Sequence, residues 1–155
     1  MNFKDFRTEL SIYRPEEIVF VGLGNLYRGD DSAGLVFLDK LKTRAEFMDS
    51  NFIYAQTNPE NHLNEILSFH TSAVIFIDAF MPGNEKDCIT WLNEEQIDKI
   101  GISTHSFSLS LIARYLRLNK QVAIRFLGIS IKSNKFGDTI SHSTLEFIDG
   151  FFLNK

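Results

Sequence analysis

Two acidic residues stand side by side where a buried strand is expected to end. The strand is an apolar run over residues 18–24 that contains β-branched residues and ends in glycines, and the loop 25–30 ends with Asp30, directly before Asp31. In open α/β sheets the ligand site lies outside the carboxyl ends of the strands. One Asp suffices to cap the following helix through its exposed backbone N–H groups. The second Asp is therefore a candidate functional residue.

The charge of this loop argues against nucleotide binding. Its glycines have the G-x-x-x-x-G spacing of a phosphate-binding loop, but Asp30 and Asp31 follow where Lys and Ser or Thr would be needed. A dinucleotide fingerprint needs a third glycine where Tyr27 stands, and an acid near the end of the second strand, which instead closes with Gln56 and Thr57. The loop favours a cation instead.

Asp78 and His105 extend this candidate site. Asp78 directly follows the apolar run 73–77. Its alternative, non-functional role is that of a loop carboxylate exposed to solvent. If the strands before Asp31 and Asp78 are parallel neighbours, the two carboxylates emerge at one edge and could share a cation. His105 precedes a helix expected from about Ser106, where the helix dipole favours the neutral imidazole that coordinates metals. Its alternative role is an ordinary cap or turn histidine.

Two carboxylates and one imidazole leave coordination positions open for water or substrate, as catalytic metal sites do. Oxygen and nitrogen donors of this kind accept Zn, Mn, Fe, Co or Ni, so the residues alone do not choose between these metals. The other histidines lack partners at metal-binding spacing, and we interpret them as surface or packing residues: His62, His70 and His142.

No nucleophile with a convincing context is evident. Ser103 lies in Gly-Ile-Ser-Thr-His, which lacks the final glycine of G-x-S-x-G and follows no clear strand. Cys88 has no histidine beside it in the sequence. Both are interpreted as turn or packing residues, so water activated by a metal or a carboxylate suits this chain better.

The elements that position these residues alternate between strands and helices. Strands are expected over 18–24, 52–57, 73–78, 89–92 and 122–129, and helices around 35–41, 63–67, 106–118 and 143–153. The segment 89–92 is a candidate edge strand. This alternation predicts one α/β domain, a three-layer α/β/α sandwich around a mainly parallel, mixed five-stranded sheet.

Composition restricts the partners of the chain. Its 155 residues are 44% hydrophobic, include 15 Phe, and carry a net charge of −4 with scattered basic residues. Neither nucleic acid nor an anionic membrane surface is indicated. A single cysteine fits a reducing compartment, and the first 17 residues lack the apolar core of a signal peptide. We therefore expect a cytoplasmic protein.

An ordered set of motifs resembles the hydrogenase maturation proteases. The opening signature is Val-Gly-Leu-Gly-Asn at 21–25, followed by Arg-Gly-Asp-Asp at 28–31 and by Gly34. Pro-Glu-Asn at 59–61, Ile-Asp-Ala at 77–79 and Ser-Thr-His-Ser at 103–106 follow in order, with a weaker Leu-Gly-Ile at 127–129. The resemblance covers Ile18 to about Ile129.

This resemblance implies a fold and an activity. The fold would be the phosphorylase/hydrolase-like sandwich, and the activity that of a peptidase of aspartic or metal-dependent type. Such enzymes remove a C-terminal extension from the large-subunit precursor of nickel-iron hydrogenases after nickel insertion. Asp31, Asp78 and His105 match the family's metal-contacting positions, and Asp31 and Asp78 are the catalytic candidates. The nickel would be carried by the precursor, so the free enzyme, expected to be a monomer, could be metal-free.

Other features bear on the branch and on the specificity. Asp at position 31 together with Pro-Glu-Asn resembles the branch that serves formate-hydrogenlyase-type hydrogenases. The chain departs from the family pattern at Ser32, usually Gly, and at Ser130 and Ile131, where Gln-Pro is common. Residues 1–15 form an N-terminal extension of the single domain 1–155, with no role assigned.

Two alternative functions stay open at this point. One is a maturation factor that recognises the nickel-loaded precursor without cutting it, since no side-chain nucleophile is evident. The other is a small-molecule metallohydrolase on the same fold.

Overall fold

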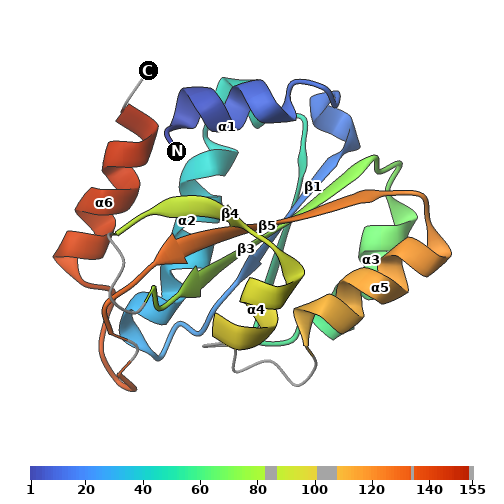
Figure 1. Ribbon diagram of the computed structural model, residues 1–155. Coiled ribbons are helices and arrows are strands. Elements are labelled where there is room, and N and C mark those ends of the chain that lie inside the picture. Colours follow the sequence, from blue (N-terminus) through green and yellow to red (C-terminus); the bar gives the residue numbers. More distant parts are fainter. Residues whose placement is uncertain (83–86, 101–107, 134, 154–155) are drawn as a thin grey trace.

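The computed structural model describes residues 1–82, 87–100, 108–133 and 135–153 (Figure 1). A sheet of five strands is covered by helices on both faces. The strands are β1 (Ile18–Leu23), β2 (Asn51–Gln56), β3 (Ala73–Phe80), β4 (Ile89–Leu92) and β5 (Ala123–Ser130). The α-helices are α1 (Phe3–Leu10), α2 (Ala33–Lys42), α3 (Leu63–Ser68), α4 (Glu94–Ile100), α5 (Leu109–Asn119) and α6 (His142–Leu153). Short 3₁₀ turns are η1 (Pro15–Glu17), η2 (Gly29–Ser32), η3 (Ala45–Phe47) and η4 (Pro59–His62).

The strand order is β2-β1-β3-β5-β4. The pairs β1–β2, β1–β3 and β3–β5 are parallel, whereas β4 pairs antiparallel with β5 at the edge. The predicted mainly parallel, mixed five-stranded sheet is therefore confirmed. The chain moves outward from β1 to β2 and then returns past β1 to β3, so the strand order reverses between β1 and β3. Open α/β sheets place their ligands at such a switch point.

The reversal also explains how the helices are distributed. Right-handed crossovers in opposite directions place their helices on opposite faces of a sheet. Accordingly α2 packs on one face together with α1 and α6, and α3 and α5 pack on the other (Figure 1). The central strands contribute apolar side chains to both layers, so β1 is buried along its whole length. That is why its sequence is a continuous apolar run instead of an alternating one.

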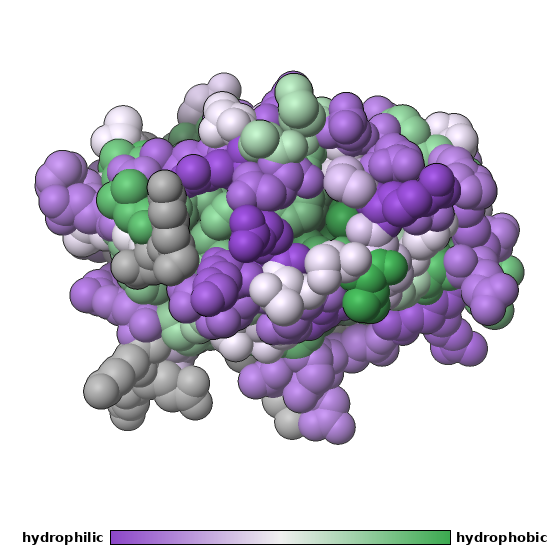
Figure 2. Space-filling view, turned by 90° about the horizontal axis from the view of Figure 1, so that it is seen from above, coloured by the Kyte–Doolittle hydropathy of each residue, from purple (hydrophilic) through white to green (hydrophobic). Residues whose placement is uncertain are grey.

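Helix α1 is an element that the strand-and-helix pattern of the sequence did not predict. Its side chains Phe3, Phe6 and Leu10 are buried and join the same apolar cluster as α2 and α6. Asn2 and Asp5 form a capping box, which fixes the start of this eight-residue helix. Seen from above, the side of the molecule that carries α1 is mostly covered by polar side chains, with apolar ones visible between them (Figure 2).

Several boundaries differ from the expected ones. β3 continues to Phe80 instead of ending at Asp78, because its pairing with β5 extends to the Phe80–Ser130 pair. α5 begins at Leu109, three residues later than predicted, with Ser108 as its N-cap. Among the described residues, no helix combines the length and apolar character that crossing a bilayer requires.

Candidate functional site

The loop after β1 is folded back against the acidic pair by one glycine. Gly24 has a φ of +132°, which a residue with a Cβ rarely adopts, and its N–H donates to the Gln56 carbonyl at 3.0 Å. A Cβ on Gly24 would lie 2.1 Å from the carbonyl oxygen of Asp31. The loop therefore needs glycine here to place Asp31 directly beyond the end of β1.

A second glycine seats the start of α2 on the ends of the two central strands. A Cβ on Gly34 would lie 2.4 Å from the Leu23 carbonyl oxygen and 2.6 Å from that of Ile77. These carbonyls belong to the end of β1 and to β3, so the first turn of α2 packs across the switch point. The turn η2, which contains Asp31, also contacts β3.

Asp30 has a structural role. Its Oδ1 accepts a hydrogen bond from the Ser141 backbone N–H at 2.7 Å, and its Oδ2 accepts one from the Ser141 hydroxyl at 3.0 Å. Ser141 directly precedes α6, so Asp30 ties the first loop to the start of the last helix. Asp30 is 5% exposed. Asp30 therefore anchors the chain, and Asp31 is the acid of this pair that belongs to the candidate site.

Asp31 and Asp78 lie at the same edge of the sheet. β1 and β3 are parallel neighbours, as the shared-cation hypothesis required, and their pairing ends at Gly22 and Ile77. Asp78 is the next residue of β3, so its carboxylate lies at the level where the pairing of β3 with β1 stops. Asp31 is 3% exposed, whereas Asp78 is partly exposed. The Oδ1 atom of Asp78 accepts a hydrogen bond from the Ala79 N–H at 2.9 Å.

His105 lies outside the described residues, as do Ser103, Thr104 and Ser106, so its ligand role stays a prediction. α5, which follows this segment in the chain, starts at the edge of the sheet where Asp31 and Asp78 lie, because it leads into the amino end of β5. Within the described residues, no group of three His, Cys, Asp or Glu side chains is arranged to hold a metal ion. The described part of the candidate site is therefore its pair of carboxylates.

The remaining histidines lie at the surface, in agreement with the sequence interpretation. The side chain of His70 is 88% exposed and that of His142 is 85% exposed. His62 is less exposed, but its Nδ1 lies 3.0 Å from Glu65 of the same helical segment. Each of these rings has a carboxylate within 4 Å, and none has the multiple donors of a metal site.

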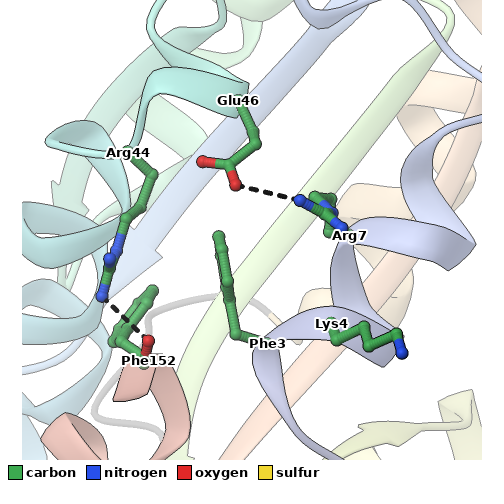
Figure 3. Close-up of a pocket in the computed structure, with 6 residues that line it drawn as sticks. All are labelled: Phe3, Lys4, Arg7, Arg44, Glu46 and Phe152. Carbon is green, nitrogen blue, oxygen red and sulfur yellow. Dashed lines mark hydrogen bonds and ion pairs between the residues drawn. The ribbon is translucent and has the colours of Figure 1, made fainter. Parts of the chain in front are cut away.

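A cleft of about 450 Å³ lies between α1, the segment around η3, and α6 (Figure 3). Its lining is basic and aromatic, and the Arg7 guanidinium is already paired with Glu46 at 3.2 Å. Arg44 lies over the rings of Phe3 and Phe152 and donates to the Phe152 carbonyl at 3.2 Å. None of the predicted site residues lines this cleft, and its contacts join α1 to the rest of the fold.

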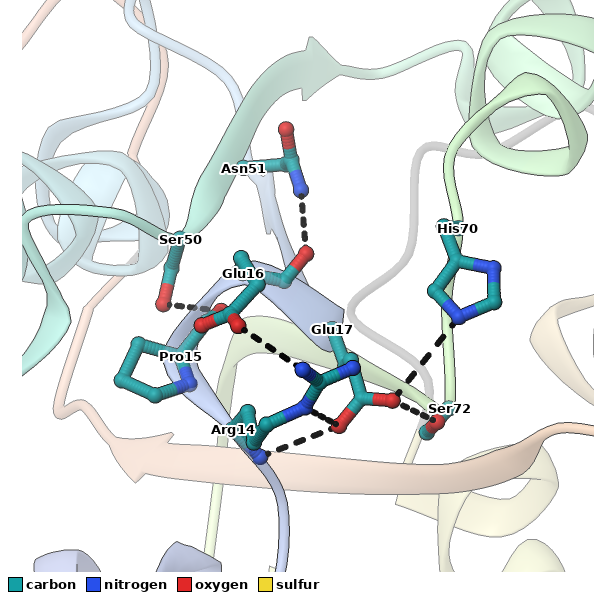
Figure 4. A network of polar contacts seen from close by, with 8 residues as sticks. All are labelled: Arg14, Pro15, Glu16, Glu17, Ser50, Asn51, His70 and Ser72. Atoms are coloured by element: carbon teal, nitrogen blue, oxygen red, sulfur yellow. Dashed lines mark hydrogen bonds and ion pairs between the residues drawn. The ribbon is translucent and has the colours of Figure 1, made fainter.

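A large shift in acidity, that of Glu17, lies at the opposite end of the sheet (Figure 4). A hydrogen bond from the Arg14 guanidinium, 3.1 Å from Nε to Oε2, lowers the pKa of Glu17 to about 2. The Arg14 backbone N–H and the Ser72 hydroxyl also donate to this carboxylate. Glu17 directly precedes β1, so this network stabilises the amino end of the sheet and takes no part in the candidate site.

Comparison with known proteins connects this geometry with a family. No family model matches the chain. A protein of Methanocaldococcus jannaschii, provisionally named as a hydrogenase maturation protease, is 26% identical over 157 aligned positions that cover 90% of this chain and 93% of the relative. The aligned region contains the glycines and acids described above.

In its sequence the chain is similar to a hydrogenase maturation protease over nearly its whole length.

Solved structures share the fold. The [NiFe] hydrogenase maturation protease HycI from Thermococcus kodakarensis superposes with a TM-score of 0.78 at 24% identity, covering 94% of this chain and 92% of that one. The endopeptidase HycI from Escherichia coli gives 0.71 at 22% identity over 85% of this chain and 84% of its own, and HybD from the same organism gives 0.67 at 16%, covering 86% and 85%.

The residues that depart from the family pattern are accommodated locally. The buried Ser32 hydroxyl donates to the Gly29 carbonyl at 2.8 Å, which closes η2. The Ser130 hydroxyl accepts from the Cys88 N–H at 2.7 Å, and the Ser130 N–H donates to the Cys88 carbonyl. Ser130 therefore fixes the start of β4 beside β5, and Cys88 serves in that contact as a backbone partner.

Sequence reasoning assigned no role to two motif residues that the fold sets apart. The Nε atom of Arg28 and the Oε2 atom of Glu60 are both excluded from solvent, and among the described residues neither has a hydrogen-bond partner. The motifs Arg-Gly-Asp-Asp and Pro-Glu-Asn marked these positions, but burial depends on distant elements that the motifs do not specify.

Proposed function

We propose that the chain is an endopeptidase that removes the C-terminal extension of a nickel-iron hydrogenase large-subunit precursor. The observation that carries this proposal is the placement of Asp31 and Asp78 at one edge of the β1–β3 switch point, built by close packing at Gly24 and Gly34. The similarity to the relative from Methanocaldococcus jannaschii supports the same activity. The assignment to the branch of formate-hydrogenlyase-type hydrogenases belongs to this proposal too.

The carboxylates, together with His105, would contact nickel that the precursor already holds. Carboxylate oxygen and imidazole nitrogen suit divalent nickel, although they also suit neighbouring transition metals. In this proposal nickel is part of the substrate, and the enzyme binds the nickel of the precursor before it cleaves the peptide bond. The burial of Asp31 restricts its rotamers, which gives the metal a fixed ligand direction.

Peptide hydrolysis needs a group that accepts a proton from water as the water oxygen attacks the carbonyl carbon. The same group can then deliver that proton to the departing amine as the C–N bond breaks. Asp78 is the better candidate of the two carboxylates because it is partly exposed, and water can reach it more readily than Asp31. We therefore assign proton transfer to Asp78 and positioning to Asp31.

The test is the intact mass of a co-expressed large-subunit precursor, nickel-loaded or nickel-free, after incubation with the protein. The variants are Asp78→Asn and Asp31→Asn, and Asp49→Asn at an exposed position is the matched control. We expect the precursor to lose a C-terminal peptide only when nickel is bound. Cleavage should persist with the control and fall at least 100-fold with Asp78→Asn, the usual range for a lost general base.

Other outcomes identify the alternative functions. An unchanged mass with a verified nickel-loaded precursor, accompanied by tight binding, would indicate a recognition factor that does not cut. Cleavage that is independent of nickel would indicate a general metallohydrolase. Equal rates for the protein and Asp78→Asn would remove Asp78 from the chemistry.

A further inference from the structure

Exposed apolar side chains follow each of the three central strands. The loop after β1 carries Leu26 and Tyr27, which are 56% and 72% exposed. Met81 directly follows β3 and is 40% exposed, and Phe136, in the segment between β5 and α6, is 76% exposed. Because β1, β3 and β5 are parallel neighbours, the segments that follow them leave the sheet at the edge where the candidate site lies. We call these four side chains the apolar rim.

The backbone fixes two parts of the apolar rim to one another. The Gly137 N–H donates to the Tyr27 carbonyl at 2.7 Å, and the Gly29 N–H donates to the Asp138 carbonyl at 2.9 Å. Phe136 directly precedes Gly137, so the residues that carry the two aromatic rings lie side by side at the hydrogen-bonded loops (Figure 1). A backbone that is already ordered loses less entropy when a partner binds. The two loops therefore present their rings on a prepared surface.

The apolar rim lies within reach of a polypeptide bound at the candidate site. Tyr27 precedes Asp31 by four residues, which span at most about 14 Å when fully extended, and the 3₁₀ turn η2 shortens this path. A substrate chain held at Asp31 and Asp78 needs only about four extended residues to reach Tyr27. Contiguous exposed apolar side chains mark interaction sites, and aromatic residues are enriched in protein interfaces.

The charges around the apolar rim favour a protein partner over a membrane. Residues 25–31 and 135–138 contain three acidic and two basic side chains. An anionic lipid surface gains its attraction from clusters of Lys and Arg, which these loops do not have. A mixture of aromatic and charged side chains instead resembles the centre and edge of a protein interface.

We propose that the apolar rim binds an apolar segment of the precursor that continues from the cleaved bond, an inference that rests on the endopeptidase function proposed above. Tyr27 and Phe136 supply most of the affinity, because large aromatic side chains dominate the energetics of protein interfaces. The rim positions the precursor and does not touch the reacting atoms.

The experiment measures the Kd of the intact large-subunit precursor for the immobilised protein by biolayer interferometry, and in parallel the KM and kcat of its cleavage. The variants are Tyr27→Ser and Phe136→Ser, and Phe136→Leu keeps an apolar side chain. Ile12→Ser is the matched control, because Ile12 is also 76% exposed but lies between α1 and η1, beside the amino end of β1. All four positions are changed at exposed side chains, so the melting temperature should stay within a few degrees of the parent value.

We expect Tyr27→Ser and Phe136→Ser each to raise Kd and KM about tenfold, the usual loss for an important aromatic contact. The kcat should stay constant, since a loss of uniform binding raises KM alone. Phe136→Leu should retain most of the affinity, and Ile12→Ser should change neither constant. An equal Kd for Phe136→Ser and the parent would overturn the proposal, as would a fall in kcat without a change in Kd.

Further outcomes separate this inference from the function on which it rests. If the parent binds the precursor without cutting it, the endopeptidase function fails, and the Kd values still decide whether the rim is the docking surface. A parent that binds no precursor would overturn both. A parent dimer that Phe136→Ser dissociates in analytical ultracentrifugation would identify a second copy as the occupant and overturn the proposal. Binding to vesicles of phosphatidylglycerol and phosphatidylcholine that is lost with Phe136→Ser would identify a membrane and also overturn it.

Discussion

Replacing Gly34 with alanine tests whether close packing of α2 on the central strands builds the candidate site. The added Cβ would lie 2.4 Å and 2.6 Å from two backbone carbonyl oxygens of β1 and β3, which cannot rotate away as side chains can. The start of α2 must therefore move by about 0.6 Å to reach the shortest distance, 3.0 Å, that real Cβ contacts show. Asp31 lies three residues earlier and moves with it.

The expected loss of stability follows from two opposing terms. Overpacking of this kind costs about 1–3 kcal/mol, and rigid backbone partners place Gly34 at the upper end. Alanine regains up to about 1 kcal/mol of helix propensity. The net loss of about 2 kcal/mol corresponds to a fall in Tm of about 4–8 °C for a chain of this length.

The matched control is Gly150→Ala in α6, where an added Cβ meets nothing within 4 Å. Here only the propensity term acts, so Tm should rise by about 2–4 °C. Thermal unfolding followed by circular dichroism measures both variants, and precursor cleavage should fall with Gly34→Ala alone. A Gly34→Ala protein that melts at or above the parent temperature would refute the packing argument.

Two further predictions concern the acidic residues. Asp30→Ala removes two hydrogen bonds from Ser141 to a buried carboxylate and should lower the free energy of unfolding by about 2–4 kcal/mol. Urea denaturation measures this loss, and an unchanged free energy of unfolding would contradict the anchoring role of Asp30. Because the folded pKa of Glu17 is about 2 against an ordinary 4.5, its stabilising effect is complete above pH 4.5 and disappears as the pH falls toward 2. Melting temperatures of the parent and Glu17→Gln should therefore differ at pH 7 and converge near pH 2, and a constant gap would show that the Arg14 contact does not set this pKa.

The sheet could be predicted from the sequence because its central strands are buried on both faces. Such strands read as unbroken apolar runs, and the runs at 18–24 and 73–78 located β1 and β3 within two residues. The end of β3 was placed too early because Asp78 looks like a strand terminator. Its pairing with Gly128 on β5, 50 positions away, keeps it within the strand.

Neither helix α1 nor the different roles of Asp30 and Asp31 could be predicted from apolar runs in the sequence. α1 contributes only three buried side chains among charged ones, although its Asn2–Asp5 capping box was a local sign that could have identified it. Asp30 and Asp31 are indistinguishable in the sequence, because the partner that separates them, Ser141, lies 111 positions from Asp30.

The contact between the first and last helices has a consequence for the biogenesis of the protein. Phe3 of α1 lies 5.4 Å from Phe152 and 6.2 Å from Phe151, measured between ring centroids, so residues far apart in the sequence share one apolar cluster. On the ribosome, α1 emerges long before α6 is synthesised, and its phenylalanines have no final partner during that time. Exposed apolar surface of this kind recruits chaperones or aggregates. The cluster is therefore complete only once α6 has been synthesised.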